Sequence, residues 1–213
     1  MITDERLASF INSFNTDYDD VITSIRKEAE ENNVPIIRRE AGEFIKLLLM
    51  MNKPSRILEI GSAIGFSAIF MSRFIGEDAH ITTIENYPPR IKEARRNIER
   101  AGAMDKITLI EGDALLVLPE LKASYDFIFM DAAKGQYGSF FKETIGLLDK
   151  GGILLCDNVL QDGDVLESRF AVTRRNRTIH SRMRQYLYDL KHDMRLETAL
   201  LNIGDGMSLS IRK

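Results

Sequence analysis

A short apolar run that ends in a glycine turn, residues 55–67, constrains the fold of this chain more than any other stretch. Ile57 and Leu58 suit a strand that is buried on both faces. Gly61 and Gly65 allow a sharp turn that brings the backbone close to a ligand, and a helical pattern begins directly after them. A strand, a glycine turn and a helix in this order predict a nucleotide-type cofactor site.

The turn does not match the dinucleotide fingerprint G-x-G-x-x-G. Counted from Gly61, that motif needs glycines at two positions that are occupied by Ala63 and Phe66. The turn is therefore wider than a pyrophosphate site requires, and we do not expect a nicotinamide cofactor to bind there.

The hydrophobic periodicity of the remaining chain predicts alternating strands and helices. Strands are expected at residues 55–60, 80–85, 107–111, 125–130 and 152–156, and helices at residues 66–75, 88–101, 114–121 and 137–148. Strict alternation predicts a parallel sheet with helices on both faces. Two more strand-like runs, 196–203 and 207–211, flank Gly204-Asp205-Gly206, which is a hairpin signal. We therefore expect an α/β, Rossmann-like fold whose mostly parallel seven-stranded sheet ends in an antiparallel hairpin.

The N-terminal part of the chain carries helical rather than alternating patterns. Amphipathic helices are predicted at residues 3–14, 17–32 and 40–51. With 213 residues and 44% hydrophobic content, the chain fits one α/β domain with an extension. We expect a helical extension at residues 1–53 and an α/β domain at residues 54–213, together forming one structural unit.

The composition argues against secretion and against a membrane partner. No stretch approaches the roughly 20 uninterrupted apolar residues of a membrane span, and residues 1–6 lack the basic-then-apolar order of a signal peptide. The single cysteine, Cys156, can form no intramolecular disulfide, which agrees with a reducing compartment. We therefore expect a cytoplasmic protein.

Acidic residues follow several of the predicted strands, where ligands bind in a sheet of this kind. Glu85 closes the second strand, 24 residues after Gly61, where a carboxylate would accept both ribose hydroxyls of an adenosine cofactor. Asp113 follows the third strand and is placed to meet the adenine. It could equally cap the next short helix, and the two roles are compatible.

A second group of polar residues follows the fourth and fifth strands. Asp131 closes one of these strands, and Asp157 and Asn158 close the other. Two carboxylates and an amide oxygen would then converge on one edge of the sheet. Hard oxygen ligands suit Mg²⁺, with Mn²⁺ or Ca²⁺ as alternatives. Zinc is not expected, because there is one cysteine and the three histidines lack ligand spacing.

At these residues the chain resembles the cation-dependent O-methyltransferase family that includes the catechol and caffeoyl-coenzyme A enzymes. The resemblance runs from about Val34 to the C-terminus. It is carried by Leu58-Glu-Ile-Gly-Ser-Ala-Ile-Gly-Phe-Ser-Ala68, Ile84-Glu85, Gly112-Asp-Ala114, Met130-Asp-Ala-Ala-Lys134 and Asp157-Asn158. It implies a class I methyltransferase fold, with residues 54–213 as the S-adenosylmethionine-dependent domain.

The resemblance also implies roles for individual residues. S-adenosylmethionine would contact Ile37, Glu59, Gly61, Ser67, Glu85, Asp113, Ala114 and Asp131. The metal ligands of the family correspond to Asp131, Asp157 and Asn158, and its general base corresponds to Lys134. Lys134 and Asp131 are thus the expected catalytic residues. The acceptor would bind the metal through two oxygens while one of them loses its proton. The acceptor should therefore carry two adjacent oxygen atoms.

Plant and animal members of the family place aromatic residues over a flat acceptor, whereas this chain has no tryptophan. It carries a run of arginines instead. The arginine segment, residues 169–184, contains no acidic residue and carries Arg169, Arg174, Arg175, Arg177, Arg182 and Arg184. Such segregated charge on a chain of net charge −3 indicates a polyanionic substrate, or else a solvated or dimer-facing basic helix. RNA contacts are expected from Arg174, Arg175, Arg177, Arg182 and Arg184.

With the arginine segment, the chain looks most like the bacterial tRNA 5-hydroxyuridine methyltransferases, whose substrate base presents O5 beside O4 as a catechol-like pair. Three functions stay open. The first is Mg²⁺-dependent methylation of 5-hydroxyuridine in the tRNA anticodon arm, the second is methylation of a small catechol or phenylpropanoid, and the third is non-catalytic RNA binding. The intact metal and base residues argue against the third. The apolar faces of the N-terminal helices are expected either to cover the active-site face or to pair subunits, and a homodimer is the state we expect.

Overall fold

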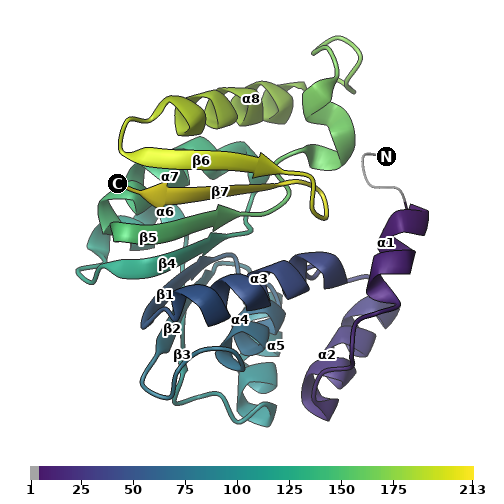
Figure 1. Ribbon diagram of the computed structural model, residues 1–213, viewed down its shortest axis with the longest axis vertical. Coiled ribbons are helices and arrows are strands. Elements are labelled where there is room, and N and C mark those ends of the chain that lie inside the picture. The colour runs from purple at the N-terminus through teal and green to yellow at the C-terminus, as the bar shows by residue number, and fades with distance from the viewer. Residues whose placement is uncertain (1–4) are drawn as a thin grey trace. The chain divides into compact units, whose positions relative to one another are not determined.

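The computed structural model describes residues 5–213, which divide into two compact units, Glu5–Asp113 and Ala114–Lys213. Strands and helices alternate from β1 to β6, with three helices in succession before β1 and the strand β7 directly after β6 (Figure 1). The strands form a mixed sheet of seven with the order β3-β2-β1-β4-β5-β7-β6. The predicted fold class is therefore confirmed, whereas the division at residue 53 remains a prediction.

The unit Glu5–Asp113 contains three parallel strands and five helices. Its helices are α1 (Glu5–Asn12), α2 (Asp20–Glu31), α3 (Arg39–Asn52), α4 (Phe66–Ser72) and α5 (Pro88–Arg100), and its strands are β1 (Arg56–Ile60), β2 (His80–Glu85) and β3 (Ile107–Glu111). Ile60 pairs with Ile84, and Ile84 pairs with Ile110. Because the three strands end level, the residues that follow them meet at one edge of the sheet.

The local sequence explains where these elements begin. The helix predicted from residue 17 starts at Asp20, because the Asp19 carboxylate accepts a hydrogen bond of 2.9 Å from the Ile22 backbone and caps the helix one turn later than expected. Prolines at the first turn of α5 lack the N–H that a helix start leaves unpaired. The helix predicted at residues 3–14 is observed as α1, and its first two positions lie outside the described residues.

The unit Ala114–Lys213 contains the rest of the sheet. Its elements are α6 (Ala114–Val117), the 3₁₀ helix η1 (Leu118–Glu120), β4 (Tyr125–Met130), the 3₁₀ helix η2 (Lys134–Gln136), α7 (Tyr137–Leu147), β5 (Leu148–Cys156), the 3₁₀ helix η3 (Gln161–Leu166), α8 (Arg177–His192), β6 (Leu196–Leu201) and β7 (Met207–Arg212). β4 and β5 are parallel, and β7 runs antiparallel to both β5 and β6. Helix α8 lies along β6 (Figure 1). The predicted C-terminal hairpin is thereby confirmed.

Two boundaries in this unit differ from the prediction. β5 begins at Leu148, four residues early, because the register against β4 shifts and the chain bulges through Gly151, whose φ is 78°. The segment after β5 contains η3, a short helix interrupted by positive φ angles at Asp162 and Gly163, which the sequence analysis did not predict. In the part of the chain that the structure describes, every helix is too short or too polar to cross a bilayer.

Candidate active site

The glycine turn after β1 has the sharply turned backbone that Gly61 and Gly65 predict. Gly61, Ala63 and Gly65 all have positive φ angles, of 93°, 44° and 79°. The backbone N–H groups of Gly61 and Ser62 both donate to the Ile84 carbonyl, at 3.0 and 3.3 Å. A Cβ atom on Gly65 would lie 3.4 Å from the Ala94 Cα atom of α5, so glycine permits the turn to pack tightly against that helix.

The Glu85 carboxylate lies beside this turn, as the parallel register requires. One of its oxygens accepts the Ala63 N–H at 2.8 Å, and the other accepts the N–H groups of Asn86 and Tyr87, both at 2.9 Å. Backbone donors thus fix both oxygens of a side chain that remains partly exposed. A carboxylate oxygen can accept more than one hydrogen bond, so Glu85 is oriented to receive a vicinal diol.

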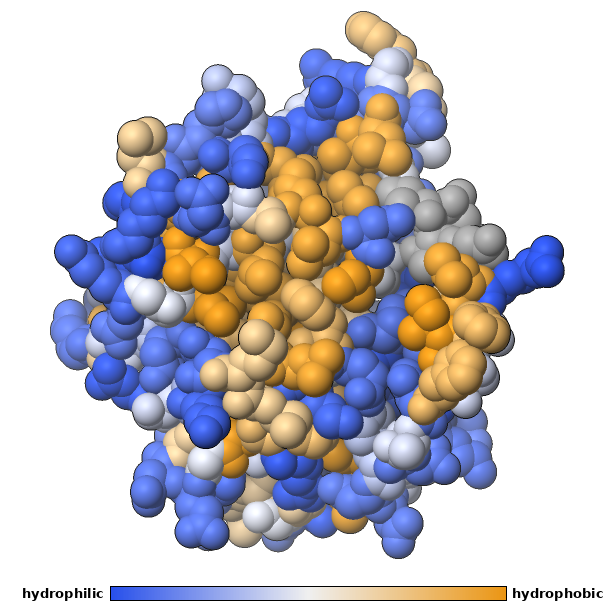
Figure 2. All heavy atoms as spheres, viewed as in Figure 1, coloured by the Kyte–Doolittle hydropathy of each residue, from blue (hydrophilic) through white to orange (hydrophobic). Residues whose placement is uncertain are grey.

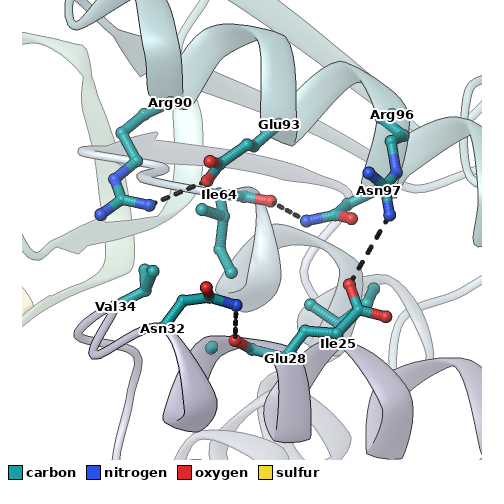
Figure 3. A pocket seen from close by; sticks show the side chains of 10 residues that line it. Ile25, Glu28, Asn32, Val34, Ile64, Arg90, Glu93, Arg96 and Asn97 are labelled. Carbon is teal, nitrogen blue, oxygen red and sulfur yellow. Dashed lines mark hydrogen bonds and ion pairs between the residues drawn. The ribbon is translucent and has the colours of Figure 1, made fainter.

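Asn97 supports the turn from behind and was missed by sequence reasoning. Its buried Nδ2 donates to the Ile64 carbonyl at 2.8 Å (Figure 3). The signal was present in the sequence, because Asn97 lies on the otherwise apolar face of α5 that Ala94 and Ile98 define. A buried amide at such a position needs a partner, and here the partner is the cofactor turn.

A cavity of about 530 Å³ opens between α2 and α5 next to this amide. It is lined by Ile25, Glu28, Ala29, Asn32, Val34, Ile64, Arg90, Glu93, Arg96 and Asn97. Figure 3 shows its charged groups paired with one another: Arg90 with Glu93 at 2.8 Å, and Arg96 with Glu28 at 3.8 Å. Because these side chains neutralise one another, the walls of the cavity carry little net charge.

The other residues expected at the cofactor differ in exposure. Asp113 is partly exposed, whereas Ile37, Ser67 and Ala114 are buried. Glu59 is fully buried and accepts a hydrogen bond of 2.5 Å from the Thr83 hydroxyl. Its observed contact thus connects β1 with β2 inside the sheet.

The predicted metal ligands come together in the unit Ala114–Lys213. Asn158 Nδ2 donates to Asp131 Oδ1 at 2.9 Å, and the Asn158 backbone N–H donates to Asp157 Oδ1 at 2.7 Å. Asn158 takes up a left-handed conformation with φ of 57°. The buried Tyr137 hydroxyl, a second group that sequence reasoning missed, donates to the Asp157 carbonyl at 2.8 Å and anchors this segment.

Both carboxyl groups of this cluster titrate abnormally. Burial, together with the neighbouring Asp131 charge, raises the pKa of Asp157 from 3.8 to about 7. Burial also raises the pKa of Asp131, although the hydrogen bond from Asn158 opposes that change. Two carboxylates that resist ionisation together are stabilised by a cation placed between them.

The donor set fits a hard divalent cation. Within residues 5–213 no three His, Cys, Asp or Glu side chains converge as a metal cluster, and the predicted set consists instead of two carboxylates and one amide. The Asn158 amide nitrogen donates to Asp131 Oδ1 at 2.9 Å, so a turn of this amide about its last side-chain bond would put the amide oxygen, a ligand that Mg²⁺ accepts, beside Asp131.

Lys134, the expected base, forms an ion pair that sequence reasoning did not foresee. Its Nζ atom lies 3.2 Å from Asp205 Oδ2. The Asp205 side chain is only 4% exposed, whereas that of Lys134 is 32% exposed. Asp205 lies between two glycines in the β6–β7 turn, where its sequence context indicates a hairpin and no catalytic contact.

The arginine segment combines two kinds of side chain. Arg174 and Arg175 are exposed in the stretch before α8. Arg182 Nη1 donates to the Gly135 carbonyl at 3.2 Å, and Arg184 Nη1 donates to the Val165 carbonyl at 3.0 Å. Arg177 donates to the Val172 and Phe170 carbonyls at 3.3 and 3.4 Å. The contact of Arg182 places the segment next to η2, which carries Lys134.

Comparison with known proteins identifies the family. Residues 13–213 match the model of a protein family described as O-methyltransferase. A catechol O-methyltransferase from Niastella koreensis is 32% identical over 155 residues, which cover 70% of each chain. A candidate caffeoyl-CoA O-methyltransferase from Staphylococcus aureus is 34% identical with a TM-score of 0.87, covering 98% of both chains. An S-adenosylhomocysteine (SAH)-bound methyltransferase from Podospora anserina is 26% identical with a TM-score of 0.88, covering 98% of this chain and 94% of that one. The chain therefore belongs to the O-methyltransferase family.

Proposed function

We propose that this O-methyltransferase uses S-adenosylmethionine and Mg²⁺ to methylate 5-hydroxyuridine in the tRNA anticodon loop, giving 5-methoxyuridine. The observation that carries the proposal is the junction of two features within the unit Ala114–Lys213. Asp131, Asp157 and Asn158 form a buried oxygen-rich cluster. The arginine segment reaches the base-bearing helix η2 through the hydrogen bond from Arg182 to Gly135.

The unit Glu5–Asp113 would bind the cofactor. Glu85, held by three backbone N–H groups, would accept the two ribose hydroxyls, and the turn at Gly61 would lie against the methionine part. The cofactor supplies an electrophilic methyl group on a sulfonium. The SAH complex of the Podospora anserina relative supports this choice of cofactor.

Asp131, Asp157 and Asn158 would hold Mg²⁺, together with two oxygens of the acceptor. The chemistry that a bound cation supplies is stabilisation of the acceptor oxyanion. Lys134 Nζ would take the proton from the acceptor hydroxyl. A new C–O bond would form as the S–CH₃ bond breaks, with S-adenosylhomocysteine as the leaving group, and the proton would remain on Lys134.

The arginine segment would select the acceptor. A base in an anticodon loop is already partly unstacked, so its insertion into a site costs less than extraction from a duplex. O4 and O5 of 5-hydroxyuridine provide the adjacent oxygens that the site requires. The exposed Arg174 and Arg175 would bind phosphates, which gives affinity and position but little sequence discrimination.

A small catechol is the competing acceptor. It is favoured by a specific observation, since the similar proteins are named for catechol and caffeoyl-CoA. Such an acceptor would also present two adjacent oxygens to the proposed metal site. It would, however, leave the arginine segment without a role in substrate binding, so activity on a free catechol that is unaffected by loss of Arg174 and Arg175 would favour it.

We also propose that the protein is a homodimer. Helix α1 exposes Leu7, Phe10 and Ile11, and Phe14 follows the helix with 72% exposure. Ile211 of the β6–β7 hairpin is 46% exposed. Figure 2 shows apolar surface over both α1 and the hairpin. Apolar patches of this kind mark association surfaces, and a second copy of the chain is the partner we propose.

The test of the acceptor is mass spectrometry of tRNA nucleosides from cells in which the gene is deleted and then restored. We expect 5-methoxyuridine to disappear on deletion, with accumulation of 5-hydroxyuridine, and to return with the wild-type gene. An Asp157→Ala gene should fail to restore it. Unchanged 5-methoxyuridine in the deletion strain would overturn the tRNA assignment.

A further inference from the structure

We propose that Asp205 is a positioning residue for the reaction, holding the Lys134 amine and the segment that follows the metal ligands in one fixed arrangement. This inference rests on the proposed function, in which Lys134 accepts the proton of the acceptor. It assigns a role to the β6–β7 turn, which lies 71 positions along the chain from Lys134.

The two oxygens of Asp205 hold two different parts of the site. Oδ2 lies 3.2 Å from Lys134 Nζ, and Oδ1 accepts the backbone N–H of Asp162 at 2.5 Å. Its side chain is nearly inaccessible to solvent. A buried carboxylate with two fixed partners has little freedom, so the positions of Lys134 and Asp162 become coupled.

The backbone of the same turn continues this attachment. The Asp205 carbonyl accepts the Leu160 N–H, and the Gly206 carbonyl accepts the Val159 N–H, both at 3.0 Å. A Cβ atom on Gly206 would lie 2.2 Å from Leu160 Cγ, and the φ of Gly206 is 81°. Only glycine therefore lets the turn approach the segment this closely.

The segment held by the turn needs such support. Asn158, Gln161 and Asp162 all have positive φ angles, of 57°, 52° and 51°. Residues other than glycine persist in this conformation when surrounding contacts determine it. The first of the three is a proposed metal ligand, so the turn sustains the strained backbone that presents its side chain.

The contact matters for the chemistry because a lysine side chain is long and flexible, and because Asp205 Oδ2 can accept a hydrogen bond from Lys134 Nζ both before and after Nζ takes the proton of the acceptor. A single buried carboxylate restricts where the amine can lie, and a catalytic group held in the productive geometry reacts faster than one that samples many positions. Loss of Asp205 should therefore lower kcat, while KM for the acceptor and affinity for S-adenosylmethionine change little.

A double-mutant cycle on full-length protein tests this coupling. The variants are Asp205→Asn, Lys134→Gln and their combination, with Asp189→Asn as a matched control at an exposed position of α8. Asparagine can still accept the Asp162 N–H through Oδ1 but offers no charge to Lys134. We expect Asp205→Asn to lower kcat by about tenfold, which corresponds to about 1.4 kcal/mol in the activation free energy, and the control to match the wild type.

The combined variant decides the mechanism. If Asp205 acts through Lys134, the combination should be no slower than Lys134→Gln alone. If the combined variant loses kcat by the product of the two single losses, the inference is overturned and the proposed function stays intact. The same holds if Asp205→Asn keeps the wild-type kcat. Wild-type kcat in Lys134→Gln would instead refute the base assigned in the proposed function, and this inference with it.

A second variant covers the case in which Asp205→Asn fails to fold, as circular dichroism would reveal. Asp205→Ser keeps a hydroxyl acceptor near the Asp162 N–H but cannot pair with Lys134. We expect the same loss of kcat, with unchanged S-adenosylmethionine affinity in calorimetry. Wild-type kcat in this variant would overturn the inference.

Discussion

Replacement of Asp157 by asparagine should stabilise the metal-free protein, and by an amount that depends on pH. The pKa of Asp157 is raised from 3.8 to about 7. Below 3.8 the group is protonated in both folded and unfolded chains. Between these two pKa values, Asp157 ionises in the unfolded chain but keeps its proton in the folded protein. The free energy of unfolding therefore falls as the pH rises, and it stops falling above about pH 7.

The size of this effect follows from the pKa difference. Each unit corresponds to about 1.4 kcal/mol, so the ionised Asp157 destabilises the metal-free protein by up to about 4 kcal/mol. Asparagine keeps an oxygen for the Asn158 N–H and does not ionise. The variant should therefore gain about 2 to 4 kcal/mol at pH 8 and less at pH 5, which corresponds to a rise in Tm of roughly 5 to 15 °C at pH 8.

Thermal unfolding followed by circular dichroism in EDTA, at pH 5 and pH 8, measures this directly. Added Mg²⁺ should then raise the Tm of the wild type, because it binds the folded state, and leave the variant almost unchanged. A variant that is less stable than the wild type at pH 8 in EDTA would refute the reasoning, since it would show that the buried carboxylate contributes stability without a cation.

Three further predictions address the cofactor, the RNA and the assembly. Glu85→Gln should weaken S-adenosylmethionine binding in calorimetry by about 1.5 to 3 kcal/mol, because charge-assisted bonds to the ribose are lost, and NAD should not compete. Arg174→Glu with Arg175→Glu should abolish tRNA binding in a filter assay, and wild-type binding should fall steeply with salt. Phe10→Ser with Phe14→Ser should reduce the mass in light scattering from dimer to monomer.

Each of these has a control and a contradicting result. Glu197→Gln, at an exposed ion pair with Lys213, should bind the cofactor normally, and equal affinity in the Glu85 variant would remove its ribose role. Charge reversal at the exposed Lys122 and Lys150 should leave tRNA binding intact, and equal loss there would mean nonspecific attraction. A monomeric wild-type protein at micromolar concentration would contradict the dimer.

The sequence predicted much of the fold because its strands are short apolar runs with clear limits. β2, β3 and β4 begin and end at the predicted residues. Boundaries were wrong where a bulge or a helix cap overrides the hydrophobic pattern. The bulge through Gly151 extends β5 backwards, and the cap at Asp19 delays the start of α2.

The site was predictable to the extent that parallel strands align the residues at their ends. Asp131, Asp157 and Asn158 meet for this reason, because β4 and β5 are adjacent and parallel. Asp205 could not be found in this way, since it comes from a turn of the antiparallel hairpin. Asn97 contacts the glycine turn from helix α5, so it is not among the residues that follow the strands.

The central claim is tested most directly by incubation of the purified protein with S-adenosylmethionine carrying a deuterated methyl group, Mg²⁺ and tRNA that contains 5-hydroxyuridine, followed by mass spectrometry of the nucleosides. We expect labelled 5-methoxyuridine to form, to be lost in EDTA and to return with added Mg²⁺. Unlabelled tRNA, in a reaction where the same protein methylates a free catechol, would contradict the claim.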